Sequence, residues 1–368
     1  EPLRDADDAV HAAADVGYPV LLKAAAGGGG KGMRVARTAD EVRKGFSQAS
    51  SEAAAAFGDG AVYLERFVDR PRHVEIQVLA DRHGTVVHLG ERECSIQRRH
   101  QKLVEETPSP AVNADLRRRM GEAAVRAAES VGYVSAGTVE FLLDPSGTFS
   151  FLEMNTRLQV EHPITELVYG VDIVREQLRI AAGHSLAVPA ERLEPRGHAI
   201  ECRITAEDPF ASFLPATGRV EYFHVPTGPG VRWDGGIETG GEISLFYDSL
   251  LGKLIVWGES RDRAIRRMSR ALDELVIVGL PTSQPFHSRV MHEPEFAAGR
   301  YDIGYLDRVG GALLARTLST AGAEEIAVAA ALAEDEARSA AVSLANNGGN
   351  GGSQDSAWLR AARLAGLR

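Results

Sequence analysis

The sequence predicts an α+β protein of more than one domain, and three observations support this prediction. Short strand-like segments rich in Val, Leu and Ile recur along the chain. Longer alanine-rich segments with few strand-forming residues lie between them and favour helices. The chain has 368 residues, which is enough for several domains and a sizeable core.

The first domain is expected at residues 1–68. We expect a helix within 1–14, strands at 18–24, 33–36 and 61–68, and a helix at 39–57. A run of glycines at 27–32 separates the first two strands. This order of strand, glycine loop, strand, helix and strand is typical of a small α/β lid domain.

Two further domains and a tail are expected after the lid. Residues 69–190 should contain a hairpin of strands 73–78 and 85–89, a helix at 114–131, a hairpin made by strand 136–144 and a strand from 149 on, and a helix at 172–182. Residues 191–310 mix short strands, Gly/Pro turns and a helix at 261–275. Residues 311–368 form a linker-like tail, in which an Asn/Gly-rich segment separates two helices.

Composition and charge exclude several classes of function. The net charge is −10, so the chain should have no general affinity for nucleic acid. No apolar run reaches the length of a membrane span. Cys94 and Cys202 are far apart and form no CxxC pair, which favours a reducing compartment. We therefore expect a cytoplasmic protein that binds neither nucleic acid nor membranes.

A pair of facing carboxylates is the first candidate site. The turn at 145–148 can close a hairpin with Asp144 opposite Phe149, and this register places Glu140 opposite Glu153. Two carboxylates about 5 Å apart repel by roughly 3 kcal/mol at an effective dielectric of about 20. A cation between them removes this cost, and oxygen ligands with Asn155 nearby suit Mg²⁺ or Mn²⁺. A solvated strand face is the alternative, but the neighbouring residues are too apolar for it.

Every second residue from Glu153 to Glu161 is polar, and an extended strand would send all of them to one face. The expected row of polar side chains is Glu153, Asn155, Arg157, Gln159 and Glu161. It combines carboxylates, amides and a guanidinium next to the candidate metal site.

The glycine run Gly27–Gly32 formally matches GxGxxG. A dinucleotide-binding fold needs a helix directly after this loop, whereas residues 33–36 are strand-like. Glycines between two strands can instead form a flap whose N–H groups approach phosphate oxygens. Lys23, just before the run, adds a positive charge for a phosphate. A flexible hairpin tip is the alternative interpretation.

Several motifs together resemble those of biotin carboxylases, which are ATP-grasp enzymes. The matching segments are Lys23–Arg34, Pro71–Glu75, Gln97–Lys102, Glu153–Pro163, Gly197–Ile204 and Tyr247–Leu254. The resemblance covers residues 17–308. It implies an ATP-grasp lid domain, 1–68, an ATP-grasp central domain, 69–190, and a biotin carboxylase C-terminal domain, 191–310.

The resemblance implies a role for each matching residue. The nucleotide-binding residues would be Lys23, Gly28, Gly29, Gly30, Met33, Glu65, Arg66, Val68, His73, Gln97 and His100. The metal ligands would be Glu140, Glu153 and Asn155. Bicarbonate would lie among Lys102, Arg157, Gln159, Val160 and Glu161. Glu161 would be the general base, with Lys102 and Arg157 also catalytic, and Arg203 would bind the biotin ureido oxygen.

The reaction implied is ATP- and bicarbonate-dependent carboxylation of biotin through carboxyphosphate. It is the first half-reaction of an acyl-CoA carboxylase, such as one acting on acetyl- or propionyl-CoA. The cofactors implied are ATP, Mg²⁺ or Mn²⁺, and biotin on a separate carrier domain. The partners implied are this carrier, a second copy of the chain in a homodimer, and a carboxyltransferase subunit.

The chain begins at Glu1, and the N-terminal Rossmann-like domain of the family is expected to be absent. Two alternatives to a complete biotin carboxylase therefore stay open. One is a truncated, non-catalytic fragment that binds nucleotide. The other is a different ATP-grasp ligase, such as carbamoyl-phosphate synthetase.

Overall fold

The computed structural model describes residues 3–25, 33–188, 194–315, 328 and 331–332. The chain divides into two compact units, residues 1–314 and residues 315–368. Nearly all of the second unit lies outside the described residues, and with it the helices and linker expected in the tail. The glycine run at 27–32, including Gly28, Gly29 and Gly30, also lies outside them.

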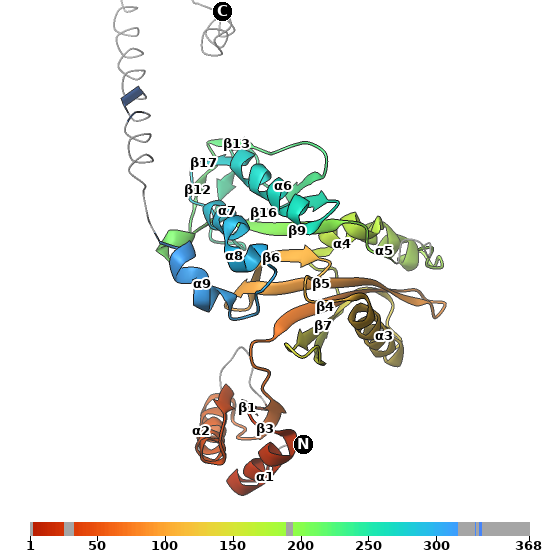
Figure 1. Ribbon diagram of the computed structural model, residues 1–368, viewed down its shortest axis with the longest axis vertical. Helices are drawn as coiled ribbons and strands as arrows, with labels where there is room; N and C mark the ends of the chain where they lie inside the picture. Colours follow the sequence, from red (N-terminus) through yellow and green to blue (C-terminus); the bar gives the residue numbers. More distant parts are fainter. Residues whose placement is uncertain (1–2, 26–32, 189–193, 316–327, 329–330, 333–368) are drawn as a thin grey trace, which may run out of the picture. The chain divides into compact units, whose positions relative to one another are not determined.

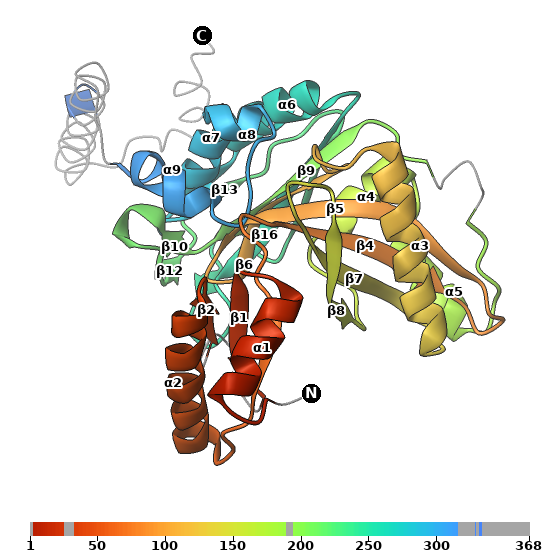
Figure 2. The same ribbon diagram turned by 60° about the horizontal axis from the view of Figure 1, so that its bottom comes forward.

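The lid has a three-stranded antiparallel sheet with two helices (Figures 1 and 2). The sheet has the order β2-β1-β3, and its elements are α1 (Ala6–Val16), β1 (Val20–Ala24), β2 (Met33–Ala36), α2 (Ala39–Phe57) and β3 (Val62–Arg66). Asp5 caps α1 and Thr38 caps α2, because each side chain accepts hydrogen bonds from main-chain N–H groups in the first turn of its helix. Small apolar residues such as Ala9, Ala13 and Val20 form the lid core.

One antiparallel sheet of eight strands lies at the centre of the rest of the first unit (Figure 1). The order is β14-β16-β9-β6-β5-β4-β7-β8. The strands are β4 (Arg72–Ala80), β5 (Val86–Arg98), β6 (Gln101–Thr107), β7 (Ser135–Leu143), β8 (Phe149–Asn155), β9 (His198–Thr205), β14 (Val231–Gly235) and β16 (Leu250–Gly258). The sheet therefore combines strands from both sides of residue 190, because β6 pairs with β9.

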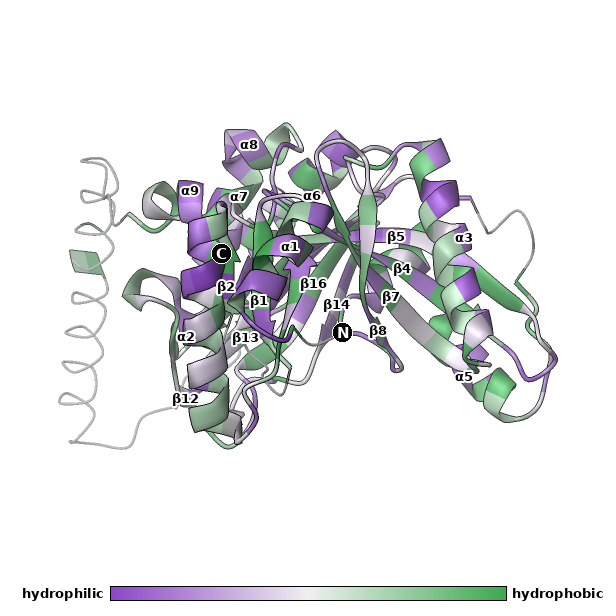
Figure 3. Cartoon of the chain, turned by 90° about the horizontal axis from the view of Figure 1, so that it is seen from below, coloured by the Kyte–Doolittle hydropathy of each residue, from purple (hydrophilic) through white to green (hydrophobic). Residues whose placement is uncertain are grey.

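Helices cover both faces of this sheet. Their bounds are α3 (Ala114–Ser130), α4 (His162–Tyr169), α5 (Ile173–Ala181), α6 (Arg261–Glu274), α7 (Gln284–His292), α8 (Pro294–Ala297) and α9 (Tyr305–Leu313). On β9 the side chains alternate between two cores: Ile200 and Cys202 pack with residues of α6 and α7, whereas Ala199 packs with residues of α4. Figure 3 shows that α3 carries both hydrophilic and hydrophobic residues, as a helix lying on a sheet requires.

Short elements complete the described region. They are β10 (Glu207–Asp208), the 3₁₀ helix η2 (Pro209–Ala211), β11 (Leu214–Pro215), β12 (Gly218–Arg219), β13 (Tyr222–His224), β15 (Glu242–Ile243) and β17 (Val276–Val278). Among the described residues no helix is both long enough and apolar enough to span a bilayer.

The structure confirms the strand at 33–36 and the helix at 39–57, and it corrects one expectation that matters for the site. β8 ends at Asn155, so the residues from 156 to 161 do not continue the strand. They form an irregular segment that ends where α4 begins at His162. The polar alternation in this segment therefore does not reflect one strand face.

Candidate active site

A cleft of about 910 Å³ lies between the lid and the large sheet. All the predicted site residues that the structure describes line this cleft. They are Lys23, Met33, Glu65, Arg66, Val68, His73, Gln97, His100, Lys102, Glu140, Glu153, Asn155, Arg157, Gln159, Val160, Glu161 and Arg203. Sequence reasoning did not include Ile303, Asp307 and Arg308, which line the same cleft from the C-terminal part.

The facing carboxylates occur as predicted, but the strand pairing next to the turn differs from the prediction. Glu140 of β7 pairs with Glu153 of β8. Nearer the turn, Leu143 rather than Asp144 lies opposite Phe149. The register shifts by one residue between the Phe141–Phe151 pair and the Glu140–Glu153 pair, and this shift restores the predicted pairing at Glu140. The predicted pairing at the site is therefore right, whereas the predicted pairing at the turn is wrong by one position.

The residues around this pair fit a divalent cation. Glu140 is buried and accepts hydrogen bonds from Lys102 and Gln159, both at 3.1 Å. Glu153 is exposed, lies 3.4 Å from the Asn155 amide nitrogen and has no cationic partner among the described residues. Two carboxylates and an amide oxygen are hard donors of the kind Mg²⁺ prefers.

The turn between β5 and β6 brings three predicted residues to the cleft. Gln97 on β5 pairs with Lys102 on β6. Arg99 and His100 join the strands with φ values of 49° and 66°, the left-handed pair that a tight two-residue hairpin needs. Residues other than glycine pay roughly 1–2 kcal/mol each for this conformation. The turn holds His100 in the cleft at this cost.

Glu161 is held by two cations, one at each carboxylate oxygen. Lys102 Nζ lies 2.7 Å from Oε1, and an Arg203 terminal nitrogen lies 2.9 Å from Oε2. Glu161 is the N-cap residue of α4, but its side chain does not cap the helix. Its carboxylate therefore lines the cleft and does not bind the first turn of α4. Its side chain is only 2% exposed. The β6–β9 pairing explains why Lys102 and Arg203, about a hundred residues apart, both reach it.

Lys102 uses its ammonium group to join three carboxylates. Besides Glu161 it donates to Glu75 at 2.5 Å and to Glu140 at 3.1 Å. An ammonium group has three donors, so all are committed. The lysine therefore links the candidate metal ligands to the candidate base.

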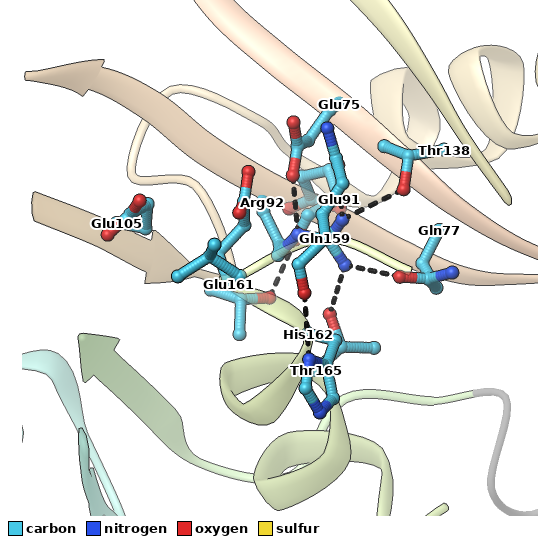
Figure 4. A network of polar contacts seen from close by, with 12 residues as sticks. Glu75, Gln77, Glu91, Arg92, Glu105, Thr138, Gln159, Glu161, His162 and Thr165 are labelled. Carbon is cyan, nitrogen blue, oxygen red and sulfur yellow. Dashed lines mark hydrogen bonds and ion pairs between the residues drawn. The ribbon is translucent and has the colours of Figure 1, made fainter. Parts of the chain in front are cut away.

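A fully buried arginine, Arg92, joins several of these residues (Figure 4). Arg92 donates to Glu75 at 2.5 Å and to Gln159 at 3.2 Å. It also donates to the oxygens of Gln77, Thr138 and Thr165 at 2.6, 3.1 and 3.0 Å. A guanidinium has five N–H donors, and here each has an acceptor. Sequence reasoning missed Arg92 and Glu75, although Glu75 had a usable signal, since it lies between Val74 and Ile76 in a strand-like segment.

The cations set the protonation of the buried acids. Burial opposes the charge on Glu75, but Lys102 and Arg92 outweigh it and lower its pKa to about 2. Burial likewise opposes the charge on Glu140, but His73 and Lys102 lower its pKa to about 2. At Glu105 burial prevails over the contact with Arg203 and raises the pKa to about 7.

A further buried acid, Glu106, joins β6 to the C-terminal part. It accepts hydrogen bonds from His198 at 2.5 Å and from Arg261 at 2.7 and 2.9 Å, and from the Tyr301 hydroxyl. Burial opposes its charge, but the contacts with His198 and Arg261 lower its pKa to about 2. The ionised carboxylate is thus the stable form in the folded protein.

We expect Glu106 to contribute to acid unfolding. Its pKa is about 2 in the folded chain and about 4.5 in the unfolded chain, so its contribution is complete above pH 4.5 and is lost as the pH falls toward 2. Urea unfolding of wild type and Glu106→Gln should therefore differ most above pH 4.5. The difference in unfolding free energy should shrink steadily below that pH. A difference that stays constant from pH 6 to pH 3 would contradict this role.

Comparison with known proteins agrees with this geometry. Residues 1–188 match the family model "Carbamoyl-phosphate synthase L chain, ATP binding domain", and residues 201–308 match "Biotin carboxylase C-terminal domain". The biotin carboxylase of Nostoc sp. is 57% identical over 297 residues, covering 81% of this chain and 66% of the relative. A pyruvate carboxylase subunit from Methanothermobacter thermautotrophicus is 53% identical over 303 residues, covering 82% of this chain and 62% of the relative.

A solved structure of a biotin carboxylase domain also matches this chain. The biotin carboxylase domain of 2-oxoglutarate carboxylase from Hydrogenobacter thermophilus, in complex with MgADP, ADP and bicarbonate, matches with a TM-score of 0.76 and 45% identity. The match covers 86% of this chain and 70% of that one. The chain spans about three fifths of the length of the curated relatives it matches.

Residues 201–308 match a domain that is described as biotin carboxylase, whereas the match to the carbamoyl-phosphate synthase ATP-binding domain ends at residue 188. The facing carboxylates, the doubly bound Glu161 and Arg203 occur together in one cleft. With its ATP-grasp fold and this C-terminal domain, the chain belongs to the biotin carboxylase family.

Proposed function

We propose that this chain carries out ATP- and bicarbonate-dependent carboxylation of biotin on a carrier domain. One observation supports the proposal above all others. Glu161 is bound by Lys102 and Arg203 in the same cleft as the Glu140–Glu153 pair. The site thus combines a base, cations for a developing negative charge, and ligands for a nucleotide-bound metal ion.

The lid and the β5–β6 hairpin would bind the nucleotide. Lys23 lies 2.7 Å from Glu65, at the edge of the cleft, and would supply positive charge to the phosphates. Met33 and the strand end at Arg66 and Val68 line the cleft beside it. His73, Gln97 and His100 line it from the large sheet. Glu140, Glu153 and Asn155 would hold Mg²⁺, which neutralises phosphate charge when bound.

Arg157, Gln159 and Val160 would surround bicarbonate next to Glu161. In the proposed step Glu161 takes the proton of bicarbonate. The freed oxygen attacks the γ-phosphorus of ATP, and the bond from this phosphorus to the bridging oxygen of ADP breaks. The products are carboxyphosphate and ADP. Lys102 and Arg203 orient the Glu161 carboxylate before the reaction, because each binds one of its oxygens.

Arg203 would then act on biotin. Its side chain lines the cleft, and its other contact, with Glu105 at 2.6 Å, fixes the plane of the guanidinium. Carboxyphosphate would split into CO₂ and phosphate, and this phosphate would take the proton of the ureido N–H. A guanidinium at the ureido oxygen would stabilise the negative charge that forms there while the deprotonated ring nitrogen attacks CO₂.

The proposed partners are a biotin-bearing carrier domain, a second copy of this chain and a carboxyltransferase subunit. We propose a cytoplasmic location, since Cys94 and Cys202 are both free and buried. The relatives include both a biotin carboxylase and a pyruvate carboxylase subunit. The final acceptor is therefore set by the carboxyltransferase partner.

An ATP-cleavage assay with and without bicarbonate and free biotin tests this function. Cleavage that needs bicarbonate, with carboxylated biotin as a product, is the expected result. ATP cleavage that also needs ammonia or glutamine would indicate a carbamoyl-phosphate synthetase. Nucleotide binding without any turnover would indicate a non-catalytic fragment.

We expect Glu153→Gln to weaken magnesium-dependent nucleotide binding by about tenfold or more, because it removes one of two anionic ligands. The exposed position of Glu153 means that the fold should not change. Calorimetric titration of the chain with ATP, with and without Mg²⁺, measures the effect. Glu129→Gln, an exposed position on α3, is the matched control. Equal Mg²⁺–ATP affinity in Glu153→Gln and wild type would remove Glu153 from the metal site.

A further inference from the structure

The irregular segment 156–161 contains most of the proposed bicarbonate site, so its shape depends on the groups that hold it. The side chains of Gln159 and Glu161 are anchored by the buried cations described above. Those contacts hold side-chain atoms. The main chain between the two anchored residues passes through Val160, which has no regular hydrogen-bonding pattern of its own.

Lys253 binds the main chain at this point. It lies on β16, directly opposite Arg203 of β9. Its side chain is only 11% exposed, and its ammonium group donates a hydrogen bond to the Val160 carbonyl oxygen. Asp234, its neighbour on β14, lies 4.0 Å from Nζ. A buried ammonium group is costly unless it is partnered, so these two contacts account for its position.

Asp234, which lies beside Lys253, is itself held in place by a neighbouring arginine. Arg232 of β14 binds both oxygens of Asp234, at 2.8 and 2.7 Å. The same guanidinium donates to Glu166 of α4 at 2.8 Å. The edge strand β14 therefore holds both α4 and, through Asp234 and Lys253, the turn that precedes α4.

We propose that Lys253 is a positioning residue for the bicarbonate site. By binding the Val160 carbonyl it sets the main-chain path that directs Val160 and Glu161 into the cleft. Lys253 does not line the cleft, so it acts through the main chain and not by touching substrate. The inference rests on the proposed function and deepens it, because it names a residue outside the site on which bicarbonate affinity depends.

The test uses Lys253→Met, which keeps an unbranched apolar stem of four atoms and removes the ammonium group. We expect the KM for bicarbonate in ATP cleavage to rise about tenfold or more, since a charged hydrogen bond to a buried carbonyl is lost. The kcat should change by less than about threefold, because both cations on the Glu161 carboxylate remain. Lys253→Arg restores a donor and should bring the KM back to within about threefold of wild type.

Lys44→Met is the matched control, because Lys44 is exposed on α2. Amide hydrogen exchange provides a readout that does not depend on activity. Exchange at residues 156–163 should be faster in Lys253→Met than in wild type or Lys44→Met, while exchange in β4 and β7 stays the same. Thermal midpoints of all variants show whether the whole fold has been weakened.

The outcomes separate the two proposals. If wild type shows no bicarbonate-dependent ATP cleavage, the proposed function fails, and exchange at 156–163 alone decides whether Lys253 tethers the turn. If wild type is active and Lys253→Met keeps the bicarbonate KM within about twofold, the positioning role is overturned. Equal losses in Lys253→Met and Lys253→Arg, with a matching fall of the thermal midpoint, also overturn it, because they indicate a purely structural lysine.

Discussion

Replacing Glu161 with glutamine is expected to slow bicarbonate-dependent ATP cleavage by about 10² or more, the range that a lost general base produces. Glutamine keeps the shape of the side chain but cannot take a proton from bicarbonate. It also loses the charge that Lys102 and Arg203 bind at 2.7 and 2.9 Å. The effect should appear in kcat, measured in the enzyme that contains this chain.

Two measurements show whether the loss is chemical. Affinity for Mg²⁺–ATP should stay within a few-fold of wild type, because Glu161 is not one of the proposed metal ligands. Glu129→Gln, on the exposed face of α3, should cleave ATP at the normal rate. A Glu161→Gln enzyme with near-normal bicarbonate-dependent turnover would show that another group takes the proton.

The pairing of Glu140 with Glu153 could be predicted because it depends on local rules. Side chains alternate along a strand, and the turn at 145–148 limits the possible registers. The register shift near Glu140 lies beyond such rules. Here the error at the turn and the register shift cancelled, so the site pairing was right although the pairing of Asp144 was not.

The segment after Asn155 shows why alternation alone is weak evidence for a strand. Its polar side chains do not share one strand face, because each binds a different partner: Gln159 contacts Arg92, and Glu161 contacts Lys102 and Arg203. The start of α4 had a usable signal in Pro163, since proline is common in the first turn of a helix. These residues line the cleft together with the other predicted site residues, but the local structure predicted for them was wrong.

Most of the buried network could not be derived from sequence, because much of it depends on pairings between distant segments. Glu75 meets Arg92 through the β4–β5 hairpin, which is local. Arg203 meets Glu161 only because β9 adds to the sheet beside β6. No periodicity in the chain specifies that neighbour, so the family resemblance was the only means of assigning Arg203 to the site.

Replacing Arg92 with methionine is expected to lower the unfolding free energy by about 3–5 kcal/mol, the usual cost of removing one partner of a buried ion pair. Arg92 is fully buried, and all five of its donors are used. The substitution leaves Glu75 with Lys102 as its remaining cation and removes the donor that Gln159 needs. Urea unfolding measures the change.

A double substitution tests whether the charge itself is the cause. If the loss of the arginine partner of the Glu75 carboxylate accounts for most of the effect, Arg92→Met with Glu75→Gln should cost clearly less than the sum of the two single changes, because the buried charge disappears with its partner. Arg126→Met on the exposed face of α3 should stay within about 0.5 kcal/mol of wild type. Strict additivity of the two single changes would show that the charges of Arg92 and Glu75 do not act together. A loss below about 1 kcal/mol for Arg92→Met would mean that water enters the site and replaces the guanidinium, in which case the buried network around Arg92 is not dry.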